Sequence, residues 1–169
     1  MLDTAAAYGY AEERIGAYLR QQEALSKRII VATKWGEEFN VATGESRYDF
    51  SRDNLQASVA RSLTRLPRID LLYIHLGSDA DVLRDASVIR EMVRMKQERI
   101  GGIRYLGVSV SRSKLLEEFV RDELLNEFDV VQMPATLFYK QKELVKKIYA
   151  QGKAIVVNSP VRKLSLIHI

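Results

Sequence analysis

The sequence predicts an α/β fold made of repeated strand–helix units, and two patterns carry this prediction. Short, continuously apolar segments alternate along the chain with longer segments in which apolar residues recur at helical spacing. The starts of the apolar segments lie roughly 24 to 41 residues apart, which suits parallel strands joined by crossover helices. Because these segments do not alternate with polar residues, we expect both faces of the sheet to be buried.

Five strands and the stub of a sixth are predicted from the apolar segments. The first complete strand, in the segment RIIVATKWG, is rich in β-branched residues, and the later ones are equally short and apolar. The stub is Met1-Leu2, and the strands lie at residues 28–36, 69–76, 103–110, 129–134 and 153–160.

Helices are predicted between the strands from apolar stripes and end signals. The helices lie at residues 11–22, 51–66, 81–102, 111–127 and 140–152. The stripe of the first holds Ala11, Ile15, Tyr18 and Leu19, and that of the second holds Leu55, Val59, Leu63 and Leu66. The expected caps are Ser51 for the second helix and Ser111 or Ser113 for the fourth, with glycines at 101, 102 and 152 ending the third and fifth.

Repeated strand–helix units of right-handed sense close in one of two ways. They form either a barrel or an open, doubly wound sheet. No Gly-x-Gly-x-x-Gly motif follows any predicted strand, which weighs against a dinucleotide-binding sheet of the Rossmann type.

Composition narrows the class of protein. The 169 residues suit one domain with a sizeable core, and the net charge of +4 is mild and dispersed, so we expect no nucleic-acid partner. No apolar stretch approaches the roughly 18 to 20 residues that span a bilayer, so no membrane partner is expected. The chain has no cysteine and no visible signal peptide, and we expect a cytoplasmic location.

Polar side chains stand at the ends of successive predicted strands. They are Asp3, Lys34, His75, Ser109, Gln132 and Ser159. In a (β/α)₈ barrel the carboxyl ends of all strands meet on the catalytic face. Asp3 and Lys34 would lie on neighbouring strands and could pair, and a lysine near Tyr8 would lower the pKa of its phenol. With His75, these groups suit protonation of a carbonyl oxygen while a hydride reaches its carbon, whereas a single histidine makes a poor metal site.

Seven short motifs occur in an order that is typical of one family. They are DTAAAYG followed by AEERIG, then ATKWG, RIDLLYIH, GGIRYLGVS, VVQMP and VVNSP. With these motifs the chain resembles the aldo-keto reductase superfamily, over residues 2 to about 163. The resemblance implies a partial (β/α)₈ TIM barrel, roughly strands 2 to 7 with their helices, and reversible hydride transfer between a nicotinamide cofactor and an aldehyde, ketone or alcohol.

Residue roles follow from the resemblance. It implies a catalytic tetrad of Asp3, Tyr8, Lys34 and His75, with Tyr8 as general acid or base. It implies cofactor contacts from Asp3, Ser109, Gln132 and Ser159, and a cofactor that is NADPH or NADH, with NADPH favoured. Two positions depart from the family pattern: Val110 stands where asparagine is frequent, and Asn158 where an aromatic residue often stacks on the nicotinamide.

Two other functions stay open. One is a non-catalytic subunit of the same fold that binds NADP(H) and regulates a partner. The other is a different (β/α) barrel enzyme such as an isomerase, although such enzymes usually place a carboxylate pair or a metal at the strand ends.

The length suggests a piece of a barrel, because a (β/α)₈ barrel typically needs about 250 residues. We expect residues 1–163 to form a partial barrel domain and residues 164–169, LSLIHI, to be a non-native tail. The family regions expected to be absent include those that hold the adenosine end of the cofactor. Because open barrel edges expose unpaired strands, we expect the 169 residues alone to be poorly soluble and inactive.

Overall fold

The computed structural model confirms the α/β class and the partial barrel. It describes residues 1–40, 42–76 and 80–159. Six parallel strands form one curved sheet, in the order β1 (Leu2–Asp3), β2 (Val31–Trp35), β5 (Leu71–His75), β6 (Tyr105–Ser109), β7 (Val130–Pro134) and β8 (Ala154–Asn158). Because this order follows the chain, each crossover returns beside the preceding strand, as in a barrel. The expected boundary between residues 163 and 164 lies outside the described residues.

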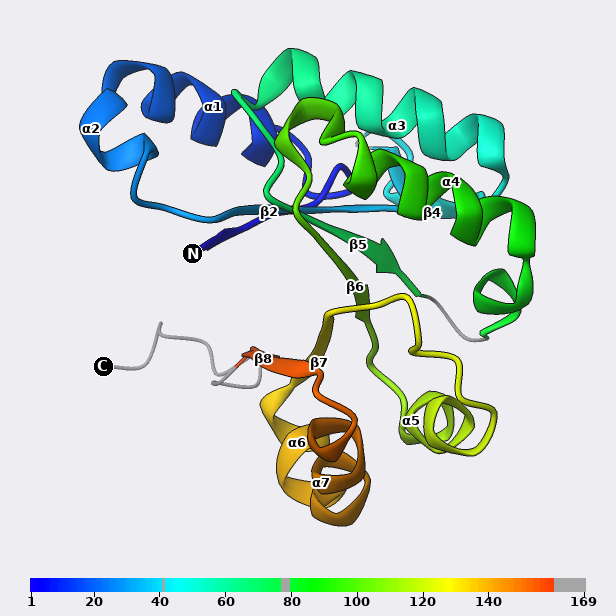
Figure 1. Cartoon of the computed structure of the whole chain (residues 1–169). Coiled ribbons are helices and arrows are strands. Elements are labelled where there is room, and N and C mark those ends of the chain that lie inside the picture. Colours follow the sequence, from blue (N-terminus) through cyan, green and yellow to red (C-terminus); the bar gives the residue numbers. More distant parts are fainter. Residues whose placement is uncertain (41, 77–79, 160–169) are drawn as a thin grey trace.

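Helices cover the convex side of the sheet. Figure 1 shows α1, α3 and α4 on one outer side and α5, α6 and α7 on the other. Their bounds are α1 (Ala11–Gln21), α2 (Glu23–Ser26), α3 (Arg52–Arg65), α4 (Ala86–Gln97), α5 (Ser113–Arg121), α6 (Ala135–Lys140) and α7 (Lys142–Ala150), with the 3₁₀ turns η1 (Asp81–Arg84) and η2 (Ile100–Gly102). None of the helices in the described part of the chain is long and apolar enough to cross a membrane.

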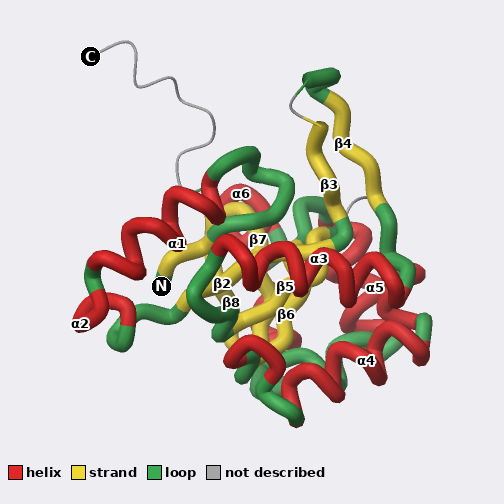
Figure 2. The backbone as a smooth tube through the Cα atoms, turned by 90° about the horizontal axis from the view of Figure 1, so that it is seen from above, coloured by secondary structure: helices red, strands yellow, loops and turns green. Residues whose placement is uncertain are grey.

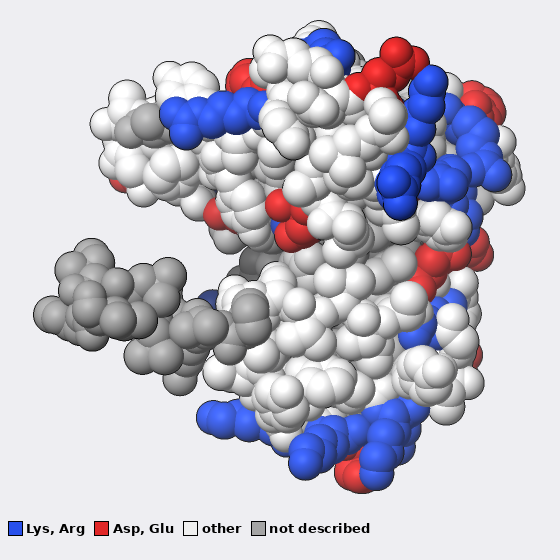
Figure 3. All heavy atoms as spheres, turned by 90° about the vertical axis from the view of Figure 1, so that its left-hand side faces the viewer, with Lys and Arg blue, Asp and Glu red and all other residues white. Residues whose placement is uncertain are grey.

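The apolar core lies mainly between the sheet and these helices. A second, smaller cluster, Ala32, Leu71, Tyr73 and Val130, lies on the opposite face of the strands. Because successive side chains of a strand alternate between faces, Lys34 shares the face of Ala32. Figure 3 shows the molecule hollowed between its upper and lower parts. The inner face of the partial barrel therefore carries apolar residues deep in the strands and polar residues toward their carboxyl ends.

A hairpin after β2 was not predicted. It consists of β3 (Glu37–Asn40) and β4 (Glu45–Tyr48), paired antiparallel with Glu37 opposite Tyr48. Figure 2 shows it projecting from the body of the molecule. All four residues of β4 are exposed, so the segment lacks the apolar pattern by which a strand is recognised.

Several predicted details are wrong. In α1, Leu19 is buried and Ile15 packs against the core as predicted, but Glu12 and Gly16 are buried with them and Tyr18 is 52% exposed. A helix can bury a carboxylate where polar partners surround it, and an apolar stripe cannot reveal such partners. The third predicted helix is divided, since α4 begins only after Asp85, whose side chain accepts hydrogen bonds from the next turn. Strand β8 is partly exposed rather than buried on both faces.

The predicted cap of α3 is confirmed, and its removal should weaken the fold. The backbone N–H of Asn54 donates to Ser51 Oγ at 3.2 Å. We expect Ser51→Ala to lower the free energy of unfolding by about 1 kcal/mol, because the helix loses a partner for one of its first N–H groups. Urea denaturation measures the change.

Ser113 provides the matched control for this prediction. It was one of two expected caps of α5, but the N-cap is Arg112 and no side chain caps this helix. Ser113→Ala should therefore leave stability nearly unchanged. An equal loss in both serine variants would contradict the capping role of Ser51.

Candidate active site

The carboxyl ends of the strands surround one open pocket of about 370 Å³. Four of the predicted site residues line it: Tyr8, His75, Ser109 and Ser159. The other three do not line this pocket: Lys34 lies against Tyr8, Gln132 is hydrogen-bonded to Ser109, and Asp3 is paired with Lys34. The structure thus brings all seven to one end of the sheet, as expected for a barrel.

Lys34 is buried at this end of the sheet and is held by two oxygens. Its side chain is 0% exposed, and Nζ donates to Asp3 Oδ2 and to the backbone oxygen of Thr4, both at 2.9 Å. The expected pairing of Asp3 and Lys34 is confirmed. A buried ammonium group needs such partners, because an isolated charge would be too costly in the protein interior. Burial lowers the pKa of Lys34, and the carboxylate of Asp3 opposes this shift.

Tyr8 lies over Lys34 at the edge of the pocket. Lys34 Nζ is 4.8 Å from the centre of the Tyr8 ring, on its face. The expected lowering of the phenol pKa is not found: burial raises the pKa of Tyr8, and the charges of Asp3 and Glu37 raise it further. Lys34 gives its hydrogen bonds to Asp3 and Thr4 and none to the phenol, so it does not reverse this upward shift of the Tyr8 pKa.

His75 ends β5 and packs against Tyr8. The two rings meet edge to face with their centres 6.0 Å apart. Burial lowers the pKa of His75, the charge of Glu37 raises it, Lys34 lowers it and Asp3 raises it. The net direction is downward, so the imidazole is neutral at pH 7. Its Nδ1 lies 2.9 Å from Glu37 Oε2, although off the line of an N–H hydrogen bond.

Ser109 and Gln132 form a polar pair on adjacent strands. The Ser109 hydroxyl donates to Gln132 Oε1 at 2.9 Å. Gln132 is completely buried, and its Nε2 has no hydrogen-bond partner among the described residues. An unpaired buried amide is costly, so this donor is suited to a ligand that brings an acceptor close to it. Ser159 follows β8 with a positive φ of 46° and lines the same pocket beside Asn158.

Four further polar residues of this region were not predicted as site residues. Tyr48, Ser111 and Arg112 line the pocket, and Glu37 contacts His75. Tyr48 and Glu37 lie on the unpredicted hairpin, and Arg112 precedes α5. Within the described part of the chain, no three His, Cys, Asp or Glu residues are grouped so that they could hold a metal ion.

A family model and two curated relatives match this chain. The model of the aldo/keto reductase family matches residues 1–166. The uncharacterised oxidoreductase YqkF of Bacillus subtilis is 30% identical over 167 residues, which is 96% of this chain and 51% of that protein. The aldo-keto reductase yakc [NADP(+)] of Schizosaccharomyces pombe is 27% identical over 147 residues, 84% of this chain and 42% of that protein.

Solved structures agree with the sequence comparisons. An aldo-keto reductase family protein of Pseudomonas aeruginosa is similar with a TM-score of 0.75 and 33% identity, covering 92% of this chain and 58% of that one. The holo form of the aldo-keto reductase AKR11C1 from Bacillus halodurans matches with a TM-score of 0.75 and 29% identity, and the match covers 95% of this chain and 52% of that one. The chain therefore spans about half the length of these relatives, and it belongs to the aldo/keto reductase family.

Proposed function

We propose that the protein is an NAD(P)(H)-dependent oxidoreductase that interconverts small aldehydes or ketones and alcohols. One observation carries the proposal: the buried Lys34, paired with Asp3, lies beneath Tyr8, and Tyr8 lies against His75, at the carboxyl ends of the strands. A phenol, an imidazole and a fixed ammonium–carboxylate pair can together handle a substrate oxygen and its proton. Family membership supports the same reaction type.

The residues near the pocket suit a nicotinamide cofactor. The unpaired Nε2 of Gln132 and the hydroxyl of Ser109 offer groups for a carboxamide, and Asp3 offers a carboxylate for a ribose hydroxyl. Ser159 would lie near the pyrophosphate. The chemistry that the bound nicotinamide supplies is hydride transfer to or from the carbonyl carbon. The yeast relative is described with NADP(+), which supports NADPH as the first cofactor to test.

In the proposed mechanism each member of the tetrad has a separate task. Tyr8 donates its phenolic proton to the carbonyl oxygen in reduction and recovers a proton in oxidation. His75 lies against Tyr8 and orients the substrate oxygen. Lys34 places a positive charge under the Tyr8 ring, which stabilises negative charge as it develops on the phenolic oxygen, and Asp3 holds Lys34 in place.

Turnover by the complete gene product tests the proposal. NADPH or NADH oxidation is followed with a panel of aldehydes and ketones, and the 169 residues are assayed in parallel. Steady, carbonyl-dependent oxidation is the expected result for the complete gene product. Tight cofactor binding without turnover of any carbonyl or alcohol would refute the proposed oxidoreductase function and would favour a regulatory subunit.

The raised pKa of Tyr8 gives the two directions of the reaction different pH profiles. A general acid must be protonated, and Tyr8 keeps its proton to above the ordinary phenol value of about 10. We therefore expect kcat/KM for carbonyl reduction to stay flat between pH 7 and 9. For alcohol oxidation kcat/KM should rise across the same range, because the required phenolate fraction grows about tenfold per pH unit. A loss of reduction centred between pH 7 and 8 would contradict this assignment.

A further inference from the structure

We propose that Glu37 is a positioning residue of this site, which fixes the tautomer of His75. In the neutral ring the proton is then on Nδ1, facing Glu37, and Nε2 is left as a hydrogen-bond acceptor. The catalytic consequence rests on the function proposed above, whereas the tautomer itself does not. Glu37 lies outside the predicted tetrad, on the hairpin that the sequence did not reveal.

Local structure aims the Glu37 side chain at the site. Gly36 has a φ of +104°, and a Cβ at this position would lie 2.3 Å from the ring of Phe50, so the chain can turn closely here only with glycine. The turn leads from β2 directly into the hairpin, where Glu37 is paired with Tyr48. The side chain is only 15% exposed, and the Ser46 hydroxyl donates to its Oε1 at 2.6 Å. One carboxylate oxygen is thus anchored within the hairpin.

The second carboxylate oxygen determines the state of His75. Glu37 Oε2 is 2.9 Å from Nδ1, and Nδ1 is shielded from solvent with no hydrogen bond in the present ring orientation. An unprotonated Nδ1 would bring its electron-rich nitrogen within 2.9 Å of a carboxylate oxygen, which is repulsive. A proton on Nδ1 turns the same contact into a charge-assisted attraction that a small ring rotation can align. A neutral imidazole carries only one N–H proton. Because Glu37 holds this proton on Nδ1, Nε2 is left without one.

The other groups near His75 leave this control to Glu37. The titratable groups that act on His75 are Glu37 from β3, Lys34 from β2, Asp3 from β1, and Tyr8 from the loop after β1. Tyr48 from β4 and Arg112 line the same pocket, and Tyr48 interacts with the Glu37 carboxylate. Lys34 and Asp3 are paired with each other. Tyr8 meets the imidazole ring edge to face. Among these described groups, Glu37 alone has an ion-pair contact with an imidazole nitrogen.

The tautomer decides which substrate oxygen His75 can recognise. With a bare Nε2, neutral His75 accepts a hydrogen bond from an alcohol hydroxyl, while the Tyr8 phenol remains the donor for a carbonyl oxygen. When His75 is protonated, both nitrogens are donors, and it can bind a carbonyl oxygen as well. Glu37 would therefore favour binding of the alcohol by the neutral site.

Nuclear magnetic resonance tests the tautomer without any turnover. The complete gene product is labelled with ¹⁵N-histidine, and the His75 signals are identified by their loss in His75→Asn. We expect a protonated Nδ1 and an unprotonated Nε2 above the titration midpoint of His75. In Glu37→Gln this preference should be lost and the midpoint should shift to lower pH, because the carboxylate no longer stabilises the imidazolium. In Glu37→Asp, which keeps the charge, the midpoint should stay closer to that of the wild type.

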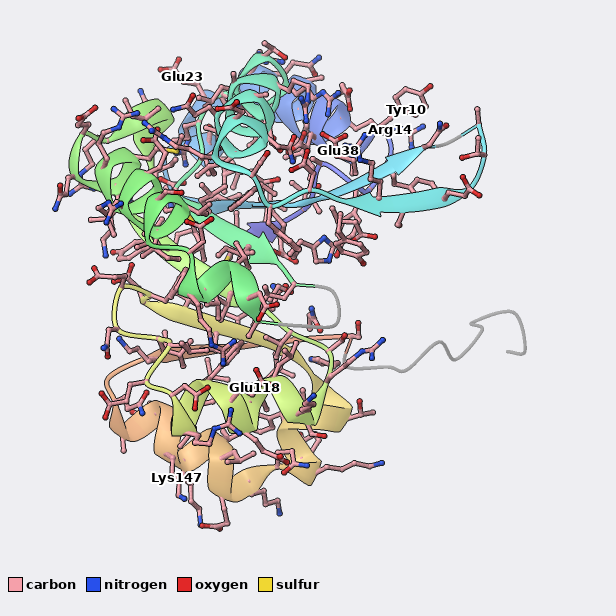
Figure 4. All side chains as sticks on the ribbon, turned by 90° about the vertical axis from the view of Figure 1, so that its right-hand side faces the viewer. Tyr10, Arg14, Glu23, Glu38, Glu118 and Lys147 are labelled. Atoms are coloured by element: carbon pink, nitrogen blue, oxygen red, sulfur yellow. The ribbon has the colours of Figure 1, made fainter. Side chains whose placement is uncertain are left out.

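The adjacent carboxylate provides the matched control. Glu38, labelled in Figure 4, pairs with Arg61 instead of the site. Glu38→Gln should leave the tautomer and the midpoint of His75 unchanged. An Nε2-protonated ring in the wild type, or identical His75 signals in Glu37→Gln and wild type, would overturn the proposal.

Kinetics separate this proposal from the proposed function. We expect Glu37→Gln to lower kcat for alcohol oxidation by about tenfold, the scale on which partners that orient a functional histidine act. Its affinity for the cofactor should not change. Turnover together with the wrong tautomer would refute only the role of Glu37, and the expected tautomer without any turnover would refute only the oxidoreductase.

Discussion

Replacing Tyr8 with phenylalanine is expected to lower kcat for carbonyl reduction by about 10²- to 10⁴-fold, the usual contribution of a positioned general acid. The variant loses one hydroxyl and keeps the ring, so its contacts with Lys34 and His75 are preserved. The proton for the carbonyl oxygen is lost with the hydroxyl. Initial rates of NADPH oxidation by the complete gene product measure the effect, and fluorescence titration checks that the affinity for the cofactor is unchanged.

Tyr10 is the matched control for this substitution. It lies two residues further along the chain, is 66% exposed, and extends from the surface in Figure 4. It is not among the residues that line the pocket. Tyr10→Phe should retain wild-type kcat, which would show that the loss does not arise from any change in this loop. If Tyr8→Phe retained more than half of the wild-type rate, Tyr8 could not be the acid.

The strands of the main sheet and the polar residues at their ends could be predicted because both depend on local patterns. Buried parallel strands are continuously apolar, and a polar residue near the end of one is conspicuous. Lys34 and Asp3 could be paired in advance because neighbouring parallel strands β1 and β2 fix their spacing. The hairpin gave no such signal, since its residues are mostly exposed and polar. Glu37 was missed together with the hairpin.

The direction in which the pKa of Tyr8 shifts could not be predicted from the sequence, for a different reason. Sequence reasoning placed a cation close to the phenol and predicted a lower pKa. The direction depends on burial and on the two nearby carboxylates, Asp3 and Glu37, which outweigh a lysine that is already paired. Such a balance depends on distances between several elements, and no single motif contains them.

Replacing Glu12 with alanine is expected to lower the free energy of unfolding by about 3–5 kcal/mol, the usual cost of breaking a buried charged network. The Glu12 side chain is 0% exposed. Its Oε1 accepts hydrogen bonds from the hydroxyls of Thr33 at 2.6 Å and Ser62 at 2.8 Å, and Arg65 Nη1 donates to its Oε2 at 3.1 Å. The alanine variant would leave both hydroxyls unpaired and a cavity between α1, β2 and α3. Urea denaturation followed by circular dichroism measures the loss.

Glu13 is the control that distinguishes the effect of losing a buried carboxylate from the effect of losing a negative charge. It also pairs with Arg65, at 3.0 Å, but its side chain is 42% exposed, so Glu13→Ala should cost less than about 1 kcal/mol. Glu12→Gln keeps the volume and one acceptor oxygen and should fall between the two alanine variants. Because Thr33 directly precedes Lys34, the loss at Glu12 should also loosen β2 beneath Tyr8 and reduce turnover. Equal destabilisation by Glu12→Ala and Glu13→Ala would mean that this buried network does not tie α1 to the strand that positions Lys34.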